Sequence, residues 1–142
     1  ETTDLLGKWV SDKELKMHQM DSYKLVMNDK ITKYPDAVFQ LKGKQSLKVV
    51  ALEYERTAKS SSRYNKMIYA YSRSSRYDFI LFVVETAAIE ACIKRAMKYV
   101  GDGFLNYKIG FMNVDDWKTD PAKGEIRGLS IGGNLTEITE KI

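Results

Sequence analysis

The sequence predicts a mixed α/β fold: one sheet that is antiparallel at a hairpin and parallel across later crossovers, with helices on both faces. Alternating apolar residues over 36–41, a turn at 42–45 and a β-branched run over 47–55 form the pattern of a hairpin. Continuous apolar runs at 77–84 and around 107–114 have the length of buried strands. Segments of helical periodicity lie between these runs, so crossovers are expected to join the later strands.

The first helix is predicted from a capping box. In Ser11-Asp12-Lys13-Glu14, the side chains of Ser11 and Glu14 are able to accept hydrogen bonds from free backbone N–H groups at a helix start. A short helix should run from there to about Met20. The polar stretch that follows ends at Tyr34-Pro35, where proline biases the preceding residue toward extended backbone, so a strand is expected to begin at Asp36.

Two longer helices are predicted after the hairpin. A serine-rich entry at 57–62 precedes one apolar stripe, and a second stripe follows the buried run at 77–84. A loop at 101–103 ends the second helix, and a last, weaker strand is expected over Glu125–Ile131. The first stripe consists of Tyr64, Met67, Ile68 and Tyr71, and the second of Ile89, Cys92, Ile93, Ala96, Met97 and Val100.

The composition predicts a single domain. The chain has 142 residues, of which 44% are hydrophobic, and this is enough for one core. The net charge of +4 permits attraction to phosphate polyanions without demanding it. Because the chain starts at Glu1 rather than Met, we expect the domain over 1–142 to be excised from a longer protein.

Several kinds of site are excluded by residue counts. Cys92 is the only cysteine, so the chain forms no internal disulfide and no multi-cysteine zinc site. His18 is the only histidine, which excludes a histidine-based zinc site or a catalytic triad from this chain alone. No run approaches the roughly 18 apolar residues of a membrane span, and the N-terminus lacks a signal-peptide layout. We therefore expect a cytoplasmic protein with no membrane partner.

Three acidic residues are expected to meet on the hairpin. Glu53 and Glu55 project from one face of their strand because side chains alternate, and strand pairing brings Asp36 beside them. Val49 and Ala51 share that face, so the acids occupy positions where a buried apolar face would ordinarily continue. A different interpretation is that Glu53 and Glu55 end an edge strand facing water and that Asp36 caps a turn.

Crowded carboxylates in a partly buried site need compensation. The simplest forms are a raised pKa or a hard divalent cation, and oxygen ligands suit Mg²⁺ or Mn²⁺. A metal ion bound by Asp36, Glu53 and Glu55 would polarise a phosphoryl oxygen and lower the pKa of a bound water. This is the chemistry of phosphodiester hydrolysis.

Four short motifs carry a resemblance to a known family. Pro35-Asp36 followed by Glu53-Tyr54-Glu55 looks like the PD-(D/E)-x-K nuclease signature with glutamate in the lysine position. More narrowly, the chain over roughly residues 9 to 84 resembles the plasmid replication-relaxation and mobilisation-associated family. The motifs are Trp9-Val10-Ser11-Asp12-Lys13-Glu14-Leu15, Pro35-Asp36-Ala37-Val38, Ala51-Leu52-Glu53-Tyr54-Glu55-Arg56 and Lys59-Ser60-Ser61-Ser62-Arg63-Tyr64.

The resemblance implies a restriction-endonuclease-like three-layer core, with a mixed central sheet flanked by helices. It implies that Glu14 is a helix-borne acid near the site and that Asp36 and Glu53 are metal ligands. Glu55 departs from the lysine that usually stabilises the transition state, which puts hydrolysis in doubt. Either the metal does more, or Lys59 reaches in from the following turn as a catalytic lysine; the alternatives for Lys59 are a phosphate contact and a surface residue.

Positive charge is concentrated directly after the acids. Several of these side chains are able to lie on one side of the second helix, which predicts salt-sensitive and weakly sequence-specific binding of nucleic acid. The alternative is an ordinary solvated helix face. Among nearby tyrosines, Tyr69 is a candidate for stacking on unpaired bases, whereas Tyr64 and Tyr71 fall on the apolar stripe. The basic residues are Arg56, Lys59, Arg63, Lys66, Arg73 and Arg76.

Three functions follow as hypotheses. The first is a Mg- or Mn-dependent endonuclease or nickase that acts on DNA in plasmid replication or mobilisation. The second is a non-catalytic DNA-binding or protein-docking domain that keeps the nuclease fold and assists a relaxase or another DNA-processing protein. The third is an α/β module for a small anionic ligand, which would use the basic helix and ignore the carboxylates.

Overall fold

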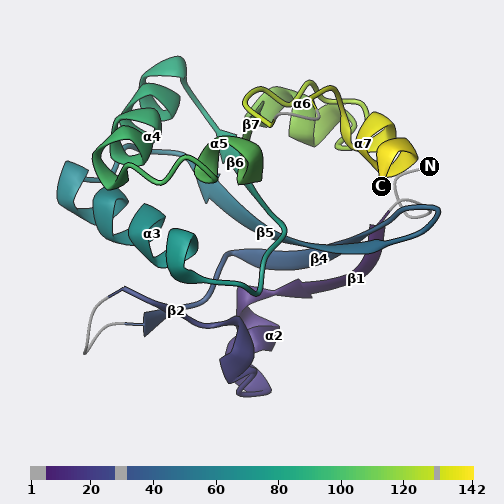
Figure 1. Ribbon diagram of the computed structural model, residues 1–142, viewed down its shortest axis with the longest axis horizontal. Helices are drawn as coiled ribbons and strands as arrows, with labels where there is room; N and C mark the ends of the chain where they lie inside the picture. Colours follow the sequence, from purple (N-terminus) through teal and green to yellow (C-terminus); the bar gives the residue numbers. More distant parts are fainter. Residues whose placement is uncertain (1–5, 28–31, 130–131) are drawn as a thin grey trace.

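The computed structural model, which describes residues 6–27, 32–129 and 132–142, confirms the mixed α/β class. Within these residues the main sheet has five strands, and β5 joins its antiparallel part, β1-β4-β5, to its parallel part, β5-β6-β7 (Figure 1). In the order of the sheet, the strands are β1 (Leu6–Ser11), β4 (Ala37–Lys42), β5 (Leu47–Glu55), β6 (Phe79–Val84) and β7 (Ile109–Asn113).

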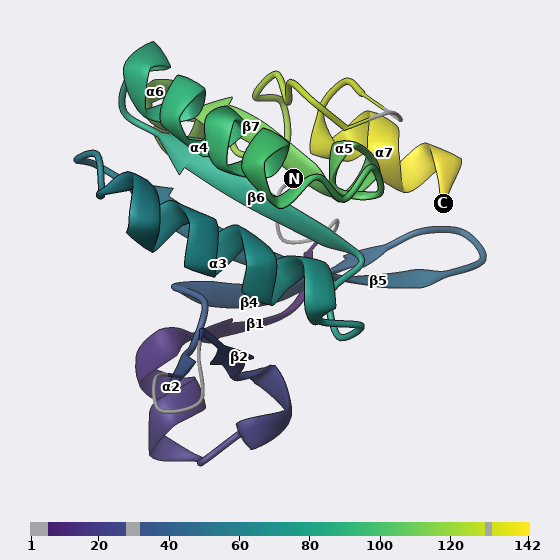
Figure 2. The same cartoon turned by 60° about the vertical axis from the view of Figure 1, so that its left-hand side comes forward.

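Helices cover both faces of the sheet. α3 (Ser61–Arg73) and α4 (Ala87–Val100) pack side by side on one face, and α6 (Val114–Thr119) and α7 (Leu135–Lys141) lie on the other (Figures 1 and 2). None of the described helices is both long and apolar enough to cross a membrane. The smaller elements are α2 (Asp12–Met17), a 3-10 turn at Asp21–Tyr23, the pair β2 (Leu25–Val26) and β3 (Thr32–Lys33), and α5 (Leu105–Lys108).

Local capping explains where the main helices begin. Ser60 Oγ accepts from the N–H of Arg63 at 3.2 Å to start α3, and Thr86 Oγ1 accepts from the N–H of Ile89 at 3.2 Å to start α4. Ser11 caps α2 as predicted, accepting from the N–H of Glu14 at 3.3 Å. This helix ends at Met17 rather than near Met20, because the chain turns out of the helix with Gln19 at φ 48°.

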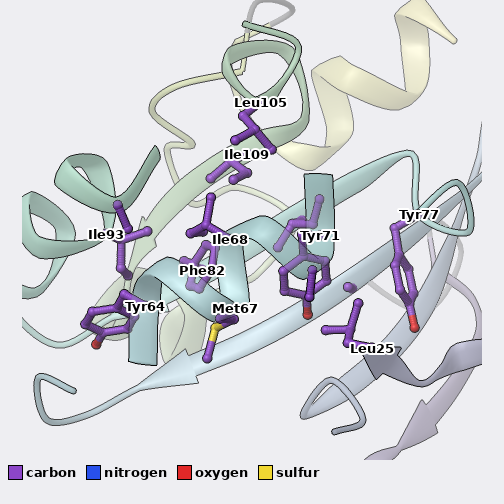
Figure 3. Packing of buried hydrophobic residues seen from close by; sticks show 14 of the residues in the cluster. Leu25, Tyr64, Met67, Ile68, Tyr71, Tyr77, Phe82, Ile93, Leu105 and Ile109 are labelled. Carbon is purple, nitrogen blue, oxygen red and sulfur yellow. The ribbon is translucent and has the colours of Figure 1, made fainter. Parts of the chain in front are cut away.

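The sheet separates two apolar clusters. The cluster under α3 and α4 includes Phe82, Ile68 and Ile93, all fully buried, and Phe82 stacks on Phe111 with ring centroids 5.9 Å apart (Figure 3). On the other face, Trp9 stacks against Phe39 and Trp117. β6 lies between the two clusters and is buried along its whole length, which explains its unbroken apolar run.

Three elements near the ends of the chain differ from what the sequence predicts. β1 was not predicted, since Gly7 and Lys8 interrupt its apolar residues. The last expected strand, Glu125–Ile131, is reduced to isolated bridges at Ile126 and Arg127, and residues 130 and 131 lie outside the described part of the chain. α7 was not predicted, because glycines 132 and 133 were interpreted as a turn and Asn134 was not recognised as an N-cap. In the structure, Asn134 Oδ1 accepts from the N–H of Glu137 at 2.9 Å.

Candidate functional site: two buried glutamates and a basic helix face

Glu53 and Glu55 lie on the face of β5 that packs under α3. Val49 and Ala51 belong to the same apolar cluster as the α3 side chains, whereas Val50, Leu52 and Tyr54 belong to the opposite one. Both glutamates are only 1% exposed, and β5 is the central strand of the sheet. The interpretation of these acids as a water-facing edge is therefore wrong, and their shared face is confirmed.

Glu53 is held by one lysine and one tyrosine. Lys33 Nζ donates to both carboxylate oxygens, at 2.6 Å and 2.8 Å, and the Lys33 side chain is itself only 16% exposed. Tyr71 OH donates to Glu53 Oε1 at 2.5 Å. Lys33 comes from β3, which pairs with β2, and Tyr71 comes from α3. Both oxygens of this buried carboxylate are thus satisfied.

Glu55 is held in the same way by a different lysine and tyrosine. Lys59 Nζ forms an ion pair with Glu55 Oε2, and Tyr64 OH donates to the same oxygen at 3.1 Å. The N–H of Lys59 donates back to Tyr64 OH at 3.2 Å. Glu55 Oε1 is buried and has no hydrogen-bond partner. Figure 3 shows Tyr64 and Tyr71 with their hydroxyl oxygens on the same side of α3.

Asp36 is held by backbone contacts rather than by the lysines and tyrosines that bind Glu53 and Glu55. Its side chain is exposed, and Asp36 Oδ2 accepts from the N–H of Tyr54 at 2.7 Å, so it closes the start of the hairpin. Its backbone carbonyl accepts from the N–H of Asp12 at 2.9 Å and anchors α2. Among the described residues, no three acidic, histidine or cysteine side chains are grouped so that they could hold a metal ion. The predicted binding of one metal ion by Asp36, Glu53 and Glu55 stays a prediction.

Among the described contacts, none joins Glu14 to Glu53 or Glu55. It is exposed in the first turn of α2, where its N–H takes part in the Ser11 cap. Lys59 contacts Glu55, one of the predicted metal ligands, and a second lysine, Lys33, contacts Glu53. Sequence reasoning missed Lys33 because the stretch before Tyr34-Pro35 has no clear periodicity. Its position three residues before Asp36 places it at the entry to the hairpin, but this position does not identify Glu53 as its partner.

Burial dominates the electrostatics of this region. It raises the pKa of Glu53 above its ordinary value, and although Lys33 opposes the shift, the charge of Asp36 adds to it. Burial also holds the pKa of Tyr71 well above its usual value and raises the pKa of Tyr64 to about 12. Both phenols therefore remain protonated donors to the glutamates near neutral pH.

Among the predicted basic residues, Lys59 forms an ion pair with a buried acid, whereas the others described below are exposed. Lys59 is engaged with Glu55, Arg56 is exposed after the end of β5, and Arg63 is exposed in the first turn of α3. Lys66 and Arg73 are exposed further along α3 and share a helix face with Tyr69. This face lies opposite the buried stripe, so we call Lys66, Tyr69 and Arg73 the outer face of α3.

Two grooves adjoin along the outer face of α3, with Tyr69 in both linings. The first, of about 530 Å³, lies between the C-terminal part of α3 and β2; the second, of about 660 Å³, lies between α3 and the end of α4. We call them the β2 groove and the α4 groove. The β2 groove includes Lys24, Tyr69, Arg73, Ser74, Ser75 and Arg76, and the α4 groove includes Ser62, Asn65, Lys66, Tyr69, Tyr99 and Val100.

A third buried acid, Glu90, lies in the first turn of α4. Arg127 donates to Glu90 Oε1 from Nη2 at 2.5 Å and also donates to Asn113 Oδ1 at 2.9 Å, while Lys94 Nζ lies 2.7 Å from Glu90 Oε2. Burial favours a higher pKa for Glu90, but the hydrogen bonds from Arg127 and Lys94 hold its pKa below the ordinary value. This network ties α4 to the segment after α6.

No protein-family model matches the chain, and neither a curated protein nor a solved structure matches it. The functional interpretation consequently depends on the geometry described above.

Replacing Lys33 with methionine should leave Glu53 buried without its cation. Breaking a buried ion pair from one side destabilises a protein by about 3–5 kcal/mol, so we expect a loss of this size at pH 7 in urea denaturation. The double variant Lys33→Met/Glu53→Gln should recover most of it, because a neutral amide still accepts from Tyr71. Lys13→Met, at an exposed position, is the control, and equal losses for Lys33→Met and Lys13→Met would contradict the assignment.

The raised pKa of Glu53 predicts a pH dependence with a definite sign. The folded protein binds this proton more tightly than the unfolded chain, so stability from Glu53 is present below its ordinary pKa of 4.5 and is lost as pH rises through the raised pKa. As pH rises through the raised pKa of Glu53, the stability of Glu53→Gln should increase relative to that of the parent protein.

Glu90→Gln is the matched control with the opposite sign. The lowered pKa of Glu90 contributes stability above 4.5 that is lost as pH falls through the lowered value. Relative to the parent, this variant should therefore become less stable as pH rises. Denaturation curves across this pH range measure both differences, and slopes of the same sign would refute the two pKa directions.

Proposed function

We propose that the chain is a nucleic-acid-binding domain of the restriction-endonuclease-like class, with DNA as its ligand, and that the outer face of α3 binds the phosphate backbone. The observation that carries the proposal is that Lys66, Tyr69 and Arg73 share one exposed helix face and line two adjoining grooves. Cations that follow a groove supply affinity for phosphates without reading sequence.

The charge of the grooves supports an anionic ligand. Lys24, Arg73 and Arg76 line the β2 groove and Lys66 lines the α4 groove, while no aspartate or glutamate is among the described residues of either lining. Lys24 Nζ also lies 3.0 Å from Asp21 Oδ1, which offsets part of its charge. A small anionic ligand would use these cations but would leave the exposed Tyr69 without a role.

The order of elements supports the proposed fold class. The β4–β5 hairpin has Asp36 at its entry and the two glutamates near its end, and α3 then crosses to the parallel strand β6. The motif resemblance over roughly residues 9 to 84 supports a place in plasmid replication or mobilisation, with a relaxase or another DNA-processing protein as partner.

The pairing of the buried acids favours a non-catalytic role. Mg²⁺ and Mn²⁺ require several free oxygen ligands, but both oxygens of Glu53 contact Lys33 and one oxygen of Glu55 contacts Lys59. The residues as arranged therefore do not fit a metal cage, and we derive no hydrolytic step through one. The lysines already supply the compensation that two buried carboxylates need.

A metal-dependent nuclease is the second candidate because of one specific observation. Glu55 Oε1 is buried without a hydrogen-bond partner, and buried polar atoms are ordinarily satisfied by protein, water or an ion. A nuclease would require Lys33 and Lys59 to release these acids to a metal.

Removing the cations of the outer face should weaken DNA binding. For Lys66→Ala/Arg73→Ala we expect a lower affinity and a shallower dependence of log K on log salt, by about 0.7–0.9 for each lost phosphate contact. Fluorescence anisotropy with a labelled oligonucleotide at several salt concentrations measures both. The control Lys13→Ala/Lys44→Ala removes the same charge from exposed positions outside the grooves. Equal losses in both double variants would assign binding to net charge and overturn the proposed face.

Divalent cations test the choice between the two candidates. We expect millimolar Mg²⁺ or Mn²⁺ to leave the thermal unfolding midpoint unchanged, because a ligand stabilises only a fold that binds it. A saturable rise that is lost in Glu53→Gln and Asp36→Asn, but retained in Asp115→Asn, would instead favour the nuclease.

A further inference from the structure

We infer that the ligand of the two grooves is single-stranded nucleic acid, with Tyr69 and Tyr99 as the surfaces on which its bases stack. The inference rests on the proposed function and deepens it, since cations alone do not distinguish single strands from duplexes. The exposed rings favour single strands, because unpaired bases offer free faces for stacking.

Tyr69 and Tyr99 come from different helices and line one groove. Tyr69 lies on α3 and is 50% exposed, and Tyr99 lies in the last turn of α4 and is 77% exposed. Two other tyrosines of α3, Tyr64 and Tyr71, are fully buried, so the helix separates its rings into a core side and a solvent side. Large aromatic side chains exposed together beside a groove often mark a binding surface.

The remaining lining of the α4 groove suits a nucleobase. A base combines flat apolar faces with hydrogen-bonding edges, and the groove offers rings and Val100 for the faces. Ser62 and Asn65 offer hydroxyl and amide groups for the edges, and Lys66 offers a cation for the adjacent phosphate. Groups of all three kinds therefore line one groove of about 660 Å³.

Arginines held against tyrosines continue the pattern into the β2 groove. Arg73 Nη1 donates to Tyr69 OH at 3.3 Å, and its guanidinium carbon lies 5.7 Å from the Tyr69 ring centroid. The guanidinium carbon of Arg76 lies 4.1 Å from the centroid of the Tyr23 ring. Such contacts restrain the cations near the groove before a phosphate arrives, which lowers the entropic penalty of binding. Cations and exposed rings thus lie together along the two grooves.

The combination of rings and cations favours a single strand over a duplex. In a duplex the base faces are covered by their neighbours, so side-chain rings do not reach them unless bases are unstacked. In a single strand every base offers a free face beside a phosphate, and stacking on aromatic side chains tolerates any sequence. An acidic peptide would satisfy the cations but would leave the rings without stacking partners.

The experiment compares four probes by anisotropy: a labelled oligothymidylate, its duplex with oligoadenylate, an abasic oligomer with the same number of phosphates, and a polyglutamate peptide. We expect the oligothymidylate to bind about tenfold more tightly than the abasic oligomer. Tyr99→Ala should weaken oligothymidylate binding about tenfold and leave binding of the abasic oligomer nearly unchanged. Tyr69→Ala also releases Arg73, so it should weaken binding of both oligomers, with the larger loss for the oligothymidylate. Tyr99→Phe, which keeps the ring, should bind like the parent.

Tyr107→Ala is the matched control, since Tyr107 is 59% exposed but lines neither groove. Equal or tighter binding of the duplex, or no effect of either Tyr→Ala variant, would overturn the single-strand inference and leave the proposed function standing. Polyglutamate bound as tightly as the oligothymidylate would also overturn it, in favour of an acidic protein partner. Failure of all three oligomers to bind would instead overturn the proposed function itself.

Discussion

The structure depends on the burial of two carboxylates beneath α3. An unpaired buried charge is strongly unfavourable, so Glu53 and Glu55 are acceptable at the centre of the sheet only with their cations and phenols in place. The requirement couples β5 both to a segment distant in sequence and to the chain that directly follows it. Lys33 ties the β2–β3 pair to β5, and Lys59 ties the chain between β5 and α3 to the end of β5.

The same constraint orients the basic face of α3. Tyr64 and Tyr71 donate to Glu55 and Glu53, respectively, so the side of the helix that bears them must face the sheet. Residues on the opposite side, among them Tyr69, are then turned toward solvent. The buried acids thus lie on one side of α3 and the exposed grooves lie on the other. The acids orient the proposed binding face but are not part of it.

The sequence could predict those features of this region that follow from strand and helix periodicity. Side-chain alternation was enough to place Glu53 and Glu55 on one face, and the spacing of Tyr64 and Tyr71 was enough to place them in the core. Periodicity carries no information on which cation meets which acid. Lys33 lies on a two-residue strand whose position depends on the fold of the preceding segment, so its contact with Glu53 was not accessible from sequence.

A buried ion pair is weak as a source of stability, and we infer that the pairs at Glu53 and Glu55 serve instead to specify how α3 packs on the sheet. Apolar residues at positions 53 and 55 would allow α3 to pack in more than one register, since one aliphatic contact replaces another at little penalty. With two carboxylates that each demand a lysine and a phenol, a shift of α3 by one turn leaves both partly unsatisfied. The position of Tyr69 and Arg73 along the grooves is thereby set by hydrogen bonds on the hidden side of their own helix.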